Sequence, residues 1–282
     1  MFRLPTLLFL LAVLAPPALL PAAEGPQHGP IFRLFYAPYG TGTLAVPYSY
    51  TAGSTTRYER RDSSNENDKK AHKTANGYRV STGYYYDFLQ CEAAFLDSNI
   101  KRQAIRERTG GVETETPLSG TVRYGEFRGG LRFSNPGDTS YHWLYAGVKR
   151  VVYRSDYNDT RATGLGYLLG YNGFLSWAQS SPIEFVFTYD IFFANYLKYD
   201  ISSSVPDMPQ WDKETRYNLG FSVGMGLQYE PYNISCVLKI MPEAHYFTKT
   251  GGTGEIRVGA FETLMGIEII YMIPNYKYNL RD

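Results

Sequence analysis

Two polar residues, Glu243 and His245, are the strongest candidates for chemistry, because they lie two residues apart in a segment with a strand pattern. Residues i and i+2 of a strand share one face, so their side chains can approach each other. A histidine near a carboxylate could act as a general base. None of the four histidines has a neighbouring aspartate, and no third group is visible that would orient the imidazole. We therefore expect no catalytic residues and no enzyme activity. The alternative is an outer-membrane protease, another hydrolase or an acyltransferase with a His–carboxylate site at the rim of a barrel.

Other patterns in the sequence do not supply a cofactor or metal site. The His and Cys residues lack the spacing of zinc ligands. The glycine-rich stretch 251–254 has no following lysine and is therefore not a phosphate-binding loop. The formal net charge of +1 gives no basic surface for nucleic acid. We expect no cofactor, no bound metal and no nucleic-acid partner.

Alternating apolar and polar residues predict the elements that position these side chains. In 216–229, the odd positions from Tyr217 to Tyr229 are apolar or aromatic, and the even positions are polar or small. Segments 164–177, 183–193 and 232–240 show the same alternation. A tilted strand needs roughly 9–11 residues to cross a bilayer, and aromatic residues gather at both membrane interfaces. Long strands with aromatic ends therefore favour a transmembrane barrel over a soluble β-sandwich.

The order of short and long connections predicts the number of strands. Short turns are expected at 87–89, 134–140, 178–182 and 230–231, whereas longer connections are expected at 57–73, 98–120, 154–162, 198–214 and 249–254. The last strand is placed at 255–273 and the first within 31–50. The predicted fold is all-β: a transmembrane antiparallel up-and-down β-barrel of ten strands. Eight strands are the alternative, if the segment before Ala75 stays outside the barrel.

The first 23 residues predict a secretory signal peptide, because Arg3 precedes an apolar stretch that ends at Ala22 and Ala23. Residues 24–282 are then a single barrel domain with long external loops near 51–76, 98–120 and 198–214. Tyr199, Met208 and Trp211, in the last of these loops, are candidates for a contact patch with an extracellular ligand.

The face opposite the apolar one carries small and charged residues, and a barrel would place them in its lumen. We expect the charged ones to form a paired network, because an unpaired buried charge is costly. The predicted network is Glu184, Asp190, Arg216, Lys239, Glu243, His245, Glu262 and Glu268.

The stretch GYYYD at 83–87, followed by EAAF at 92–95, looks like a hairpin of the small outer-membrane β-barrels of diderm bacteria. The chain resembles this group, which includes OmpA-like and OmpW-like eight-stranded proteins and ten-stranded omptins, over almost all of its mature length. The resemblance implies a monomer in the cell outer membrane, surrounded by outer-membrane lipid and inserted by the barrel-insertion machinery. Two functional classes follow. One is a barrel whose surface loops bind a ligand or serve a structural role, and the other is a narrow, porin-like channel for small solutes.

Overall fold

The computed structural model describes residues 28–45, 56–59, 74–86, 88–109, 112–134, 140–156, 159–177, 182–202, 213–251 and 254–272. The predicted signal peptide lies outside these residues. Within them, no helix is long and apolar enough to cross a membrane. The elements are β1 (His28–Ala45), β2 (Thr56–Glu59), β3 (Thr74–Tyr86), β4 (Leu89–Thr109), β5 (Val112–Ser134), β6 (Tyr141–Ser155), β7 (Thr160–Trp177), β8 (Ile183–Ser202), β9 (Lys213–Tyr229), the 3-10 turn η3 (Glu230–Tyr232), β10 (Ile234–Gly251) and β11 (Gly254–Met272).

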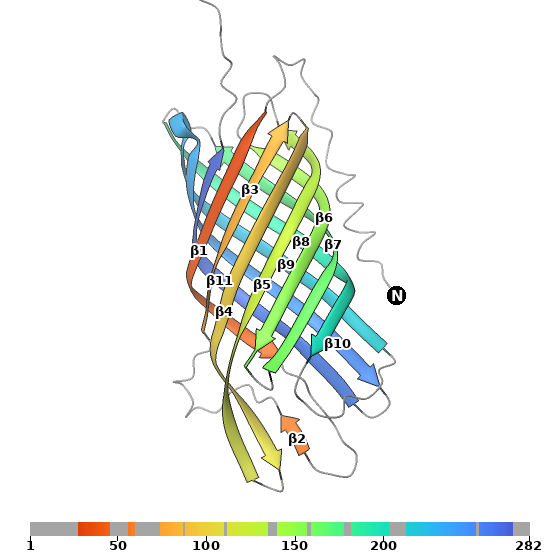
Figure 1. Ribbon diagram of the computed structural model, residues 1–282. Helices are drawn as coiled ribbons and strands as arrows, with labels where there is room; N and C mark the ends of the chain where they lie inside the picture. The colour runs from red at the N-terminus through yellow and green to blue at the C-terminus, as the bar shows by residue number, and fades with distance from the viewer. Residues whose placement is uncertain are drawn as a thin grey trace, which may run out of the picture.

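All strands except β2 form one closed antiparallel barrel (Figure 1). Each strand pairs with the next along the chain, and β1 closes the barrel by pairing with β3 on one side and β11 on the other. In the closing pair, Ile31 lies opposite Met272 and Ala45 lies opposite Gly259. The ten-stranded up-and-down prediction is therefore confirmed, and the eight-stranded alternative is wrong because β1 is a full member of the barrel.

At one end of the barrel, the turn end, the strands stop close to the predicted short turns. Phe88 and η3 lie at this end, where β5 ends at Ser134 and β6 starts at Tyr141, and β7 ends at Trp177 and β8 starts at Ile183. The β3 strand ends at Tyr86 and β4 starts at Leu89, close to the predicted turn at 87–89. In the tight connection after η3, Asn233 has a φ of 49°, a left-handed conformation that asparagine tolerates better than most residues. The last strand, Gly254–Met272, lies within one residue of its predicted position.

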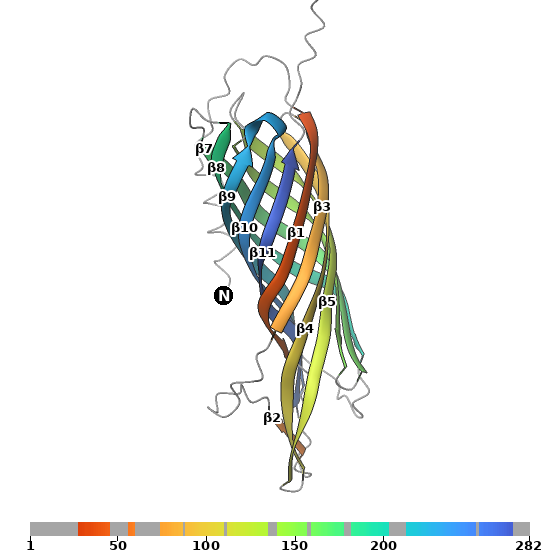
Figure 2. The same ribbon diagram turned by 90° about the vertical axis from the view of Figure 1, so that its left-hand side faces the viewer.

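At the opposite end, the loop end, the predicted loops are shorter than expected because the strands continue into them. Segment 98–120 is not a loop: β4 runs to Thr109 and β5 starts at Val112, so the two strands form a hairpin that extends beyond the barrel (Figure 2). Its charged sequence lacks an apolar face, yet an antiparallel ladder satisfies its backbone groups regardless of side chains. Similarly, β8 continues to Ser202 and β9 starts at Lys213 within the predicted loop 198–214.

The predicted loop 51–76 also contains strand residues. The short strand β2 pairs with residues 106–109 of β4, and β3 starts at Thr74. The connection predicted at 249–254 is a tight hairpin, since β10 runs to Gly251 and β11 starts at Gly254. The first barrel strand ends at Ala45, so the later residues of the predicted segment 31–50 lie outside the described residues.

The outer face of the barrel is an apolar belt. On β9, Leu219, Val223 and Leu227 point outward and are 39–56% exposed, whereas the even-numbered Asn218 and Ser222 are buried. Outward aromatic rings pair at the turn end, where the Trp177 and Phe185 centroids lie 5.6 Å apart, and at the loop end, where Tyr217 and Tyr246 stack at 5.4 Å. Beyond the loop-side rings, outward residues become charged, as with the exposed ion pair between Arg123 and Asp97. The predicted facing of β9 is confirmed.

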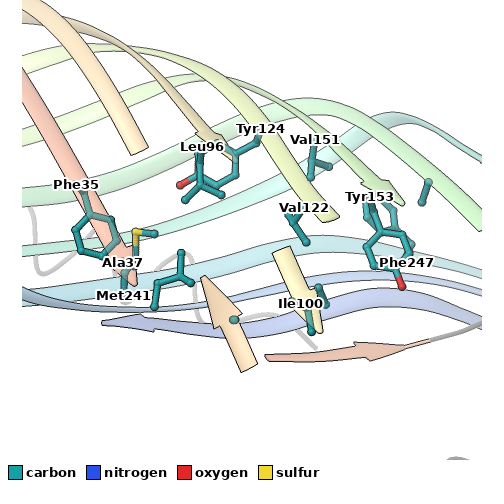
Figure 3. Close-up of a cluster of buried hydrophobic side chains, with 14 of the residues drawn as sticks. Phe35, Ala37, Leu96, Ile100, Val122, Tyr124, Val151, Tyr153, Met241 and Phe247 are labelled. Carbon is teal, nitrogen blue, oxygen red and sulfur yellow. The ribbon is translucent and has the colours of Figure 1, made fainter. Parts of the chain in front are cut away.

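The inner face holds two clusters of buried apolar side chains. Figure 3 shows the loop-end cluster, in which side chains from several strands point into the barrel. The loop-end cluster includes Phe35, Ala37, Leu96, Ile100, Val122, Tyr124, Val151, Tyr153, Tyr196, Met241, Phe247, Ala260 and Leu264. The turn-end cluster includes Ile31, Tyr85, Tyr141, Trp143, Tyr145, Leu168, Phe174, Val186, Phe192, Val237 and Ile270.

Two glycines allow neighbouring strands to approach where the ladder is irregular. A Cβ atom added at Gly166 would lie 1.9 Å from the carbonyl oxygen of Asn195, and one added at Gly266 would lie 1.9 Å from that of Tyr36. Both glycines lie beside a shift of register, between β7 and β8 and between β1 and β11. Close backbone approach at such bulges requires a residue without a side chain.

Candidate functional site

A layer of buried charges separates the two apolar clusters. On β1, the inward residues are Ile31, Arg33 and Phe35 in succession, so the arginine lies between the turn-end and loop-end clusters. On β6, Lys149 likewise lies between Tyr145 and Val151. We call this set the charged layer: Arg33, Arg79, Glu92, Glu126, Arg128, Lys149, Asp190, Lys239 and Glu268.

Glu126 is the centre of the charged layer. Its Oε1 accepts hydrogen bonds from Arg79 Nη2 at 2.7 Å and from Arg128 Nη2, and its Oε2 lies 3.8 Å from Lys149 Nζ. Arg128 also donates to Asp190 at 2.8 Å, and the hydroxyl of Tyr145 donates to the same carboxylate at 2.6 Å. Buried ions are tolerable when paired and hydrogen-bonded in this way. The arrangement therefore binds β3, β5, β6 and β8 together across the lumen.

A second group of ion pairs completes the layer near β1. Lys239 Nζ lies 2.9 Å from both carboxylate oxygens of Glu268. Glu92 lies 3.7 Å from Arg33 and 3.8 Å from Arg79. Lys239 and Glu268 are thus an ion pair of the kind expected from the sequence.

Glu243, His245 and Glu262 lie inside the loop-end cluster, and we refer to them as the Glu–His site. On β10, His245 is flanked along the inner face by Glu243 and the cluster residue Phe247. Nε2 of His245 lies 3.3 Å from Oε1 of Glu243, so the two side chains do approach each other. Lys149 Nζ donates to the same Oε1. The Ser98 hydroxyl donates to Oε2 of Glu262 at 2.6 Å.

The remaining predicted site residues lie apart from these groups. Glu184 is buried towards the turn end, and its Oε2 atom has no hydrogen-bond partner. Arg216 is half-buried near the loop end, with its guanidinium carbon 4.9 Å from the centre of the Tyr199 ring. Of the predicted contact patch, Tyr199 belongs to β8 and not to a loop, and its ring stacks on Phe247 with the ring centroids 6.1 Å apart. Met208 and Trp211 lie outside the described residues.

Most of the charged layer contributed by the first half of the chain was not predicted from the sequence. The signal was available in the alternation: on β5, Glu126 and Arg128 flank Phe127, which is 54% exposed on the outer face. The missed residues are Arg33, Arg79, Glu92, Glu126, Arg128 and Lys149.

The geometry defines the class of protein. A closed antiparallel barrel that is apolar outside and holds paired charges inside has the architecture of an outer-membrane β-barrel. No protein-family model and no curated protein matches the sequence. Among solved structures, the chain is similar to the beta domain of the Bordetella autotransporter Brka, at 14% sequence identity and a TM-score of 0.35, over 86% of this chain and 98% of that one.

Proposed function

We propose that this protein is an integral barrel of a bacterial outer membrane, closed to solutes, that presents its loop end outside the cell. The apolar outer face is the observation that carries the proposal. Leu34, Val148 and Leu169, on three different strands, point outward and are 51–53% exposed. An apolar surface that surrounds a barrel would be unfavourable in water and suits the hydrocarbon core of a bilayer.

The filled interior favours a closed barrel over a porin-like channel. Among the described residues, two apolar clusters and the charged layer are buried inside the barrel, and the side chains of Glu126 and Lys149 have no exposed surface. Water-filled porins instead leave their inward charges hydrated. We therefore favour a binding or structural role, performed at the loop end by the β4–β5 hairpin and the adjacent connections.

Export and insertion are part of the same proposal. The predicted signal peptide at 1–23 would direct the chain out of the cytoplasm, and the barrel-insertion machinery would then assemble it as a monomer among outer-membrane lipids. An extracellular ligand would meet the loop end.

Ion conductance in planar bilayers tests the closed interior. We expect the refolded protein to insert without stepwise conductance. Its gel mobility before and after boiling provides the control for folding, because a hydrogen-bonded barrel resists detergent and should migrate differently once boiled. Reproducible conductance steps from folded protein would establish the channel alternative instead.

Epitope tags test the orientation. A tag inserted between Gly110 and Gly111, in the sequence that connects β4 to β5, should bind antibody on intact cells. A tag after Gly137, in the sequence that connects β5 to β6, should bind only after the cells are permeabilised. The reverse pattern of labelling would contradict the proposed orientation.

We also propose that the protein is not an enzyme. The support is burial: Glu243 and His245 are at most 2% exposed and lie among apolar side chains, where a peptide or lipid substrate has no access. The refolded barrel should therefore release no product from a broad peptide library or from labelled lipopolysaccharide. Turnover that disappears in His245→Ala would restore the hydrolase alternative.

A further inference from the structure

We propose that Glu243, His245 and Glu262 bind a divalent transition-metal ion of the Zn²⁺ type inside the barrel. Each side chain offers one ligand atom, and these atoms lie within 4.8 Å of one another. The inference goes beyond the membrane role proposed above and does not depend on whether the barrel conducts ions.

The register of the strands places two acidic residues face to face. Glu243 on β10 lies directly opposite Glu262 on β11, and His245 follows Glu243 on the same inner face. Like charges directly opposite each other on neighbouring strands destabilise a sheet. A cation held between the two carboxylates would replace this repulsion with attraction.

The Glu–His site also contains polar atoms that lack hydrogen bonds. Oε2 of Glu243, Oε1 of Glu262 and both ring nitrogens of His245 have no hydrogen-bond partner, although all three residues are at most 2% exposed. Buried polar atoms are nearly always hydrogen-bonded in native proteins, and exceptions need an explanation such as a bound ion. Other buried atoms of the described residues, such as Oε2 of Glu184, also lack a partner, but at the Glu–His site four such atoms belong to the three residues whose ligand atoms converge.

The charges around the Glu–His site favour the binding of a cation. Lys149 contacts Oε1 of Glu243, and its ammonium lies 3.6 Å from the centre of the Tyr124 ring. Glu262 accepts a hydrogen bond from the neutral Ser98 hydroxyl. Lys149 is shared with Glu126, so it does not neutralise both Glu243 and Glu262 when these carboxylates are ionised, and a cation would supply the missing positive charge.

The donor atoms indicate the kind of ion. A histidine nitrogen with carboxylate oxygens suits Zn²⁺ and related transition metals, whereas Mg²⁺ and Ca²⁺ prefer oxygen ligands alone. Zinc ligands lie about 2.0–2.2 Å from the ion, so tetrahedral ligand atoms are about 3.3–3.6 Å apart. The three side chains would need to draw together slightly from their present spacing. The Ser98 hydroxyl would position the Glu262 carboxylate, as groups behind metal ligands commonly do.

Zinc binding to the full chain tests the proposal. The protein is refolded in detergent without an affinity tag, and His28 and His72 are replaced by Asn so that His142 and His245 are the remaining histidines. Because the site is buried in a closed interior, the unfolded chain is first stripped with EDTA and then refolded with Zn²⁺ present, and excess ion is removed by dialysis. Elemental analysis should then find about one Zn²⁺ per barrel. His245→Asn and Glu262→Gln should each weaken binding about tenfold or more.

Two matched variants serve as controls. His142→Asn removes the histidine on the outer face, and Glu184→Gln removes an inward acid at the turn end; neither should change zinc binding. Folded protein without zinc, or zinc retained by both His245→Asn and Glu262→Gln, would overturn the proposal. If these two variants do not fold, X-ray absorption spectroscopy is carried out on a zinc-loaded variant in which His142 is also replaced by Asn. His245 is then the single histidine, and the spectrum shows whether it binds the zinc ion. Scattering from an imidazole bound to the zinc ion would support the site, and the absence of this signal would overturn the proposal.

Discussion

The outer and inner faces of the barrel wall are built from the same strands, but they hold charged residues in opposite surroundings. On β5, Arg123 points outward and forms an ion pair with Asp97 at 3.0 Å, with half of the arginine side chain exposed. Three residues further on, Glu126 points inward, and its side chain contacts three cations and has no exposed surface. Outward charges therefore lie beyond the apolar belt, where water is available, whereas inward charges lie deep in the barrel and depend on one another. The surroundings of each face decide where charge is tolerated, and not the strand itself.

Removing the central anion should have the largest effect. Glu126→Gln leaves Arg79, Arg128 and Lys149 without their shared partner, and breaking a buried ion pair costs about 3–5 kcal/mol. Urea unfolding of the refolded barrel measures the free energy of unfolding. Arg123→Gln on the same strand is the control, and it should cost less than about 1 kcal/mol because the pair is exposed. Similar losses in the two variants would remove the distinction between the faces.

A charge within the apolar belt should have the next largest effect. Val223→Arg, in the middle of the outward face of β9, should lower the free energy of unfolding in lipid vesicles by about 2–4 kcal/mol. Val223→Leu keeps the surface apolar and should be nearly neutral. An unchanged free energy of unfolding in Val223→Arg would mean that this face is not in contact with lipid.

A large side chain on the inner face tests the filled interior. Ser222 is 4% exposed and lies opposite Asp190, so Ser222→Arg should overpack the lumen at a cost of about 1–3 kcal/mol. The alternating sequence is equally compatible with a water-filled lumen, and a water-filled lumen would accommodate this arginine at a lower cost. Measurement in the same vesicles as Val223→Arg compares the two faces directly, and an unchanged free energy of unfolding would point to open space inside.

The smallest effect is expected at the aromatic border of the belt. The Tyr229 and Tyr232 rings lie 5.5 Å apart at the turn end. Tyr229→Leu keeps an apolar residue but removes this ring pair, which contributes about 0.5–1.5 kcal/mol. Leu227→Ile, two residues away on the same outward face, is the control for a change without ring contacts. A loss above about 2 kcal/mol would mean that Tyr229 does more than border the belt.

Strand facing could be predicted from the sequence, but side-chain partners and strand lengths at the loop end could not. The alternation on β9 is visible because its outward residues are uniformly apolar, as Leu219 and Val223 show. The partner of Glu243 is Lys149 from β6, which is 94 residues away in the chain. Such pairing depends on the width of the barrel and the strand register. The β4–β5 extension was missed because its backbone pairing needs no apolar pattern.

The seam of the barrel, where β1 pairs with β11, affects how the protein folds. It joins Ile31 to Met272, so the first strand of the barrel cannot find its second neighbour until the last strand is present. The other neighbouring strands follow each other along the chain and can form hairpins early. Contacts between residues distant in sequence slow folding, because a long loop must be closed before they form. Closure of this seam should therefore be the slow step, and until then the unpaired edges of β1 and β11 are open to pairing with another chain.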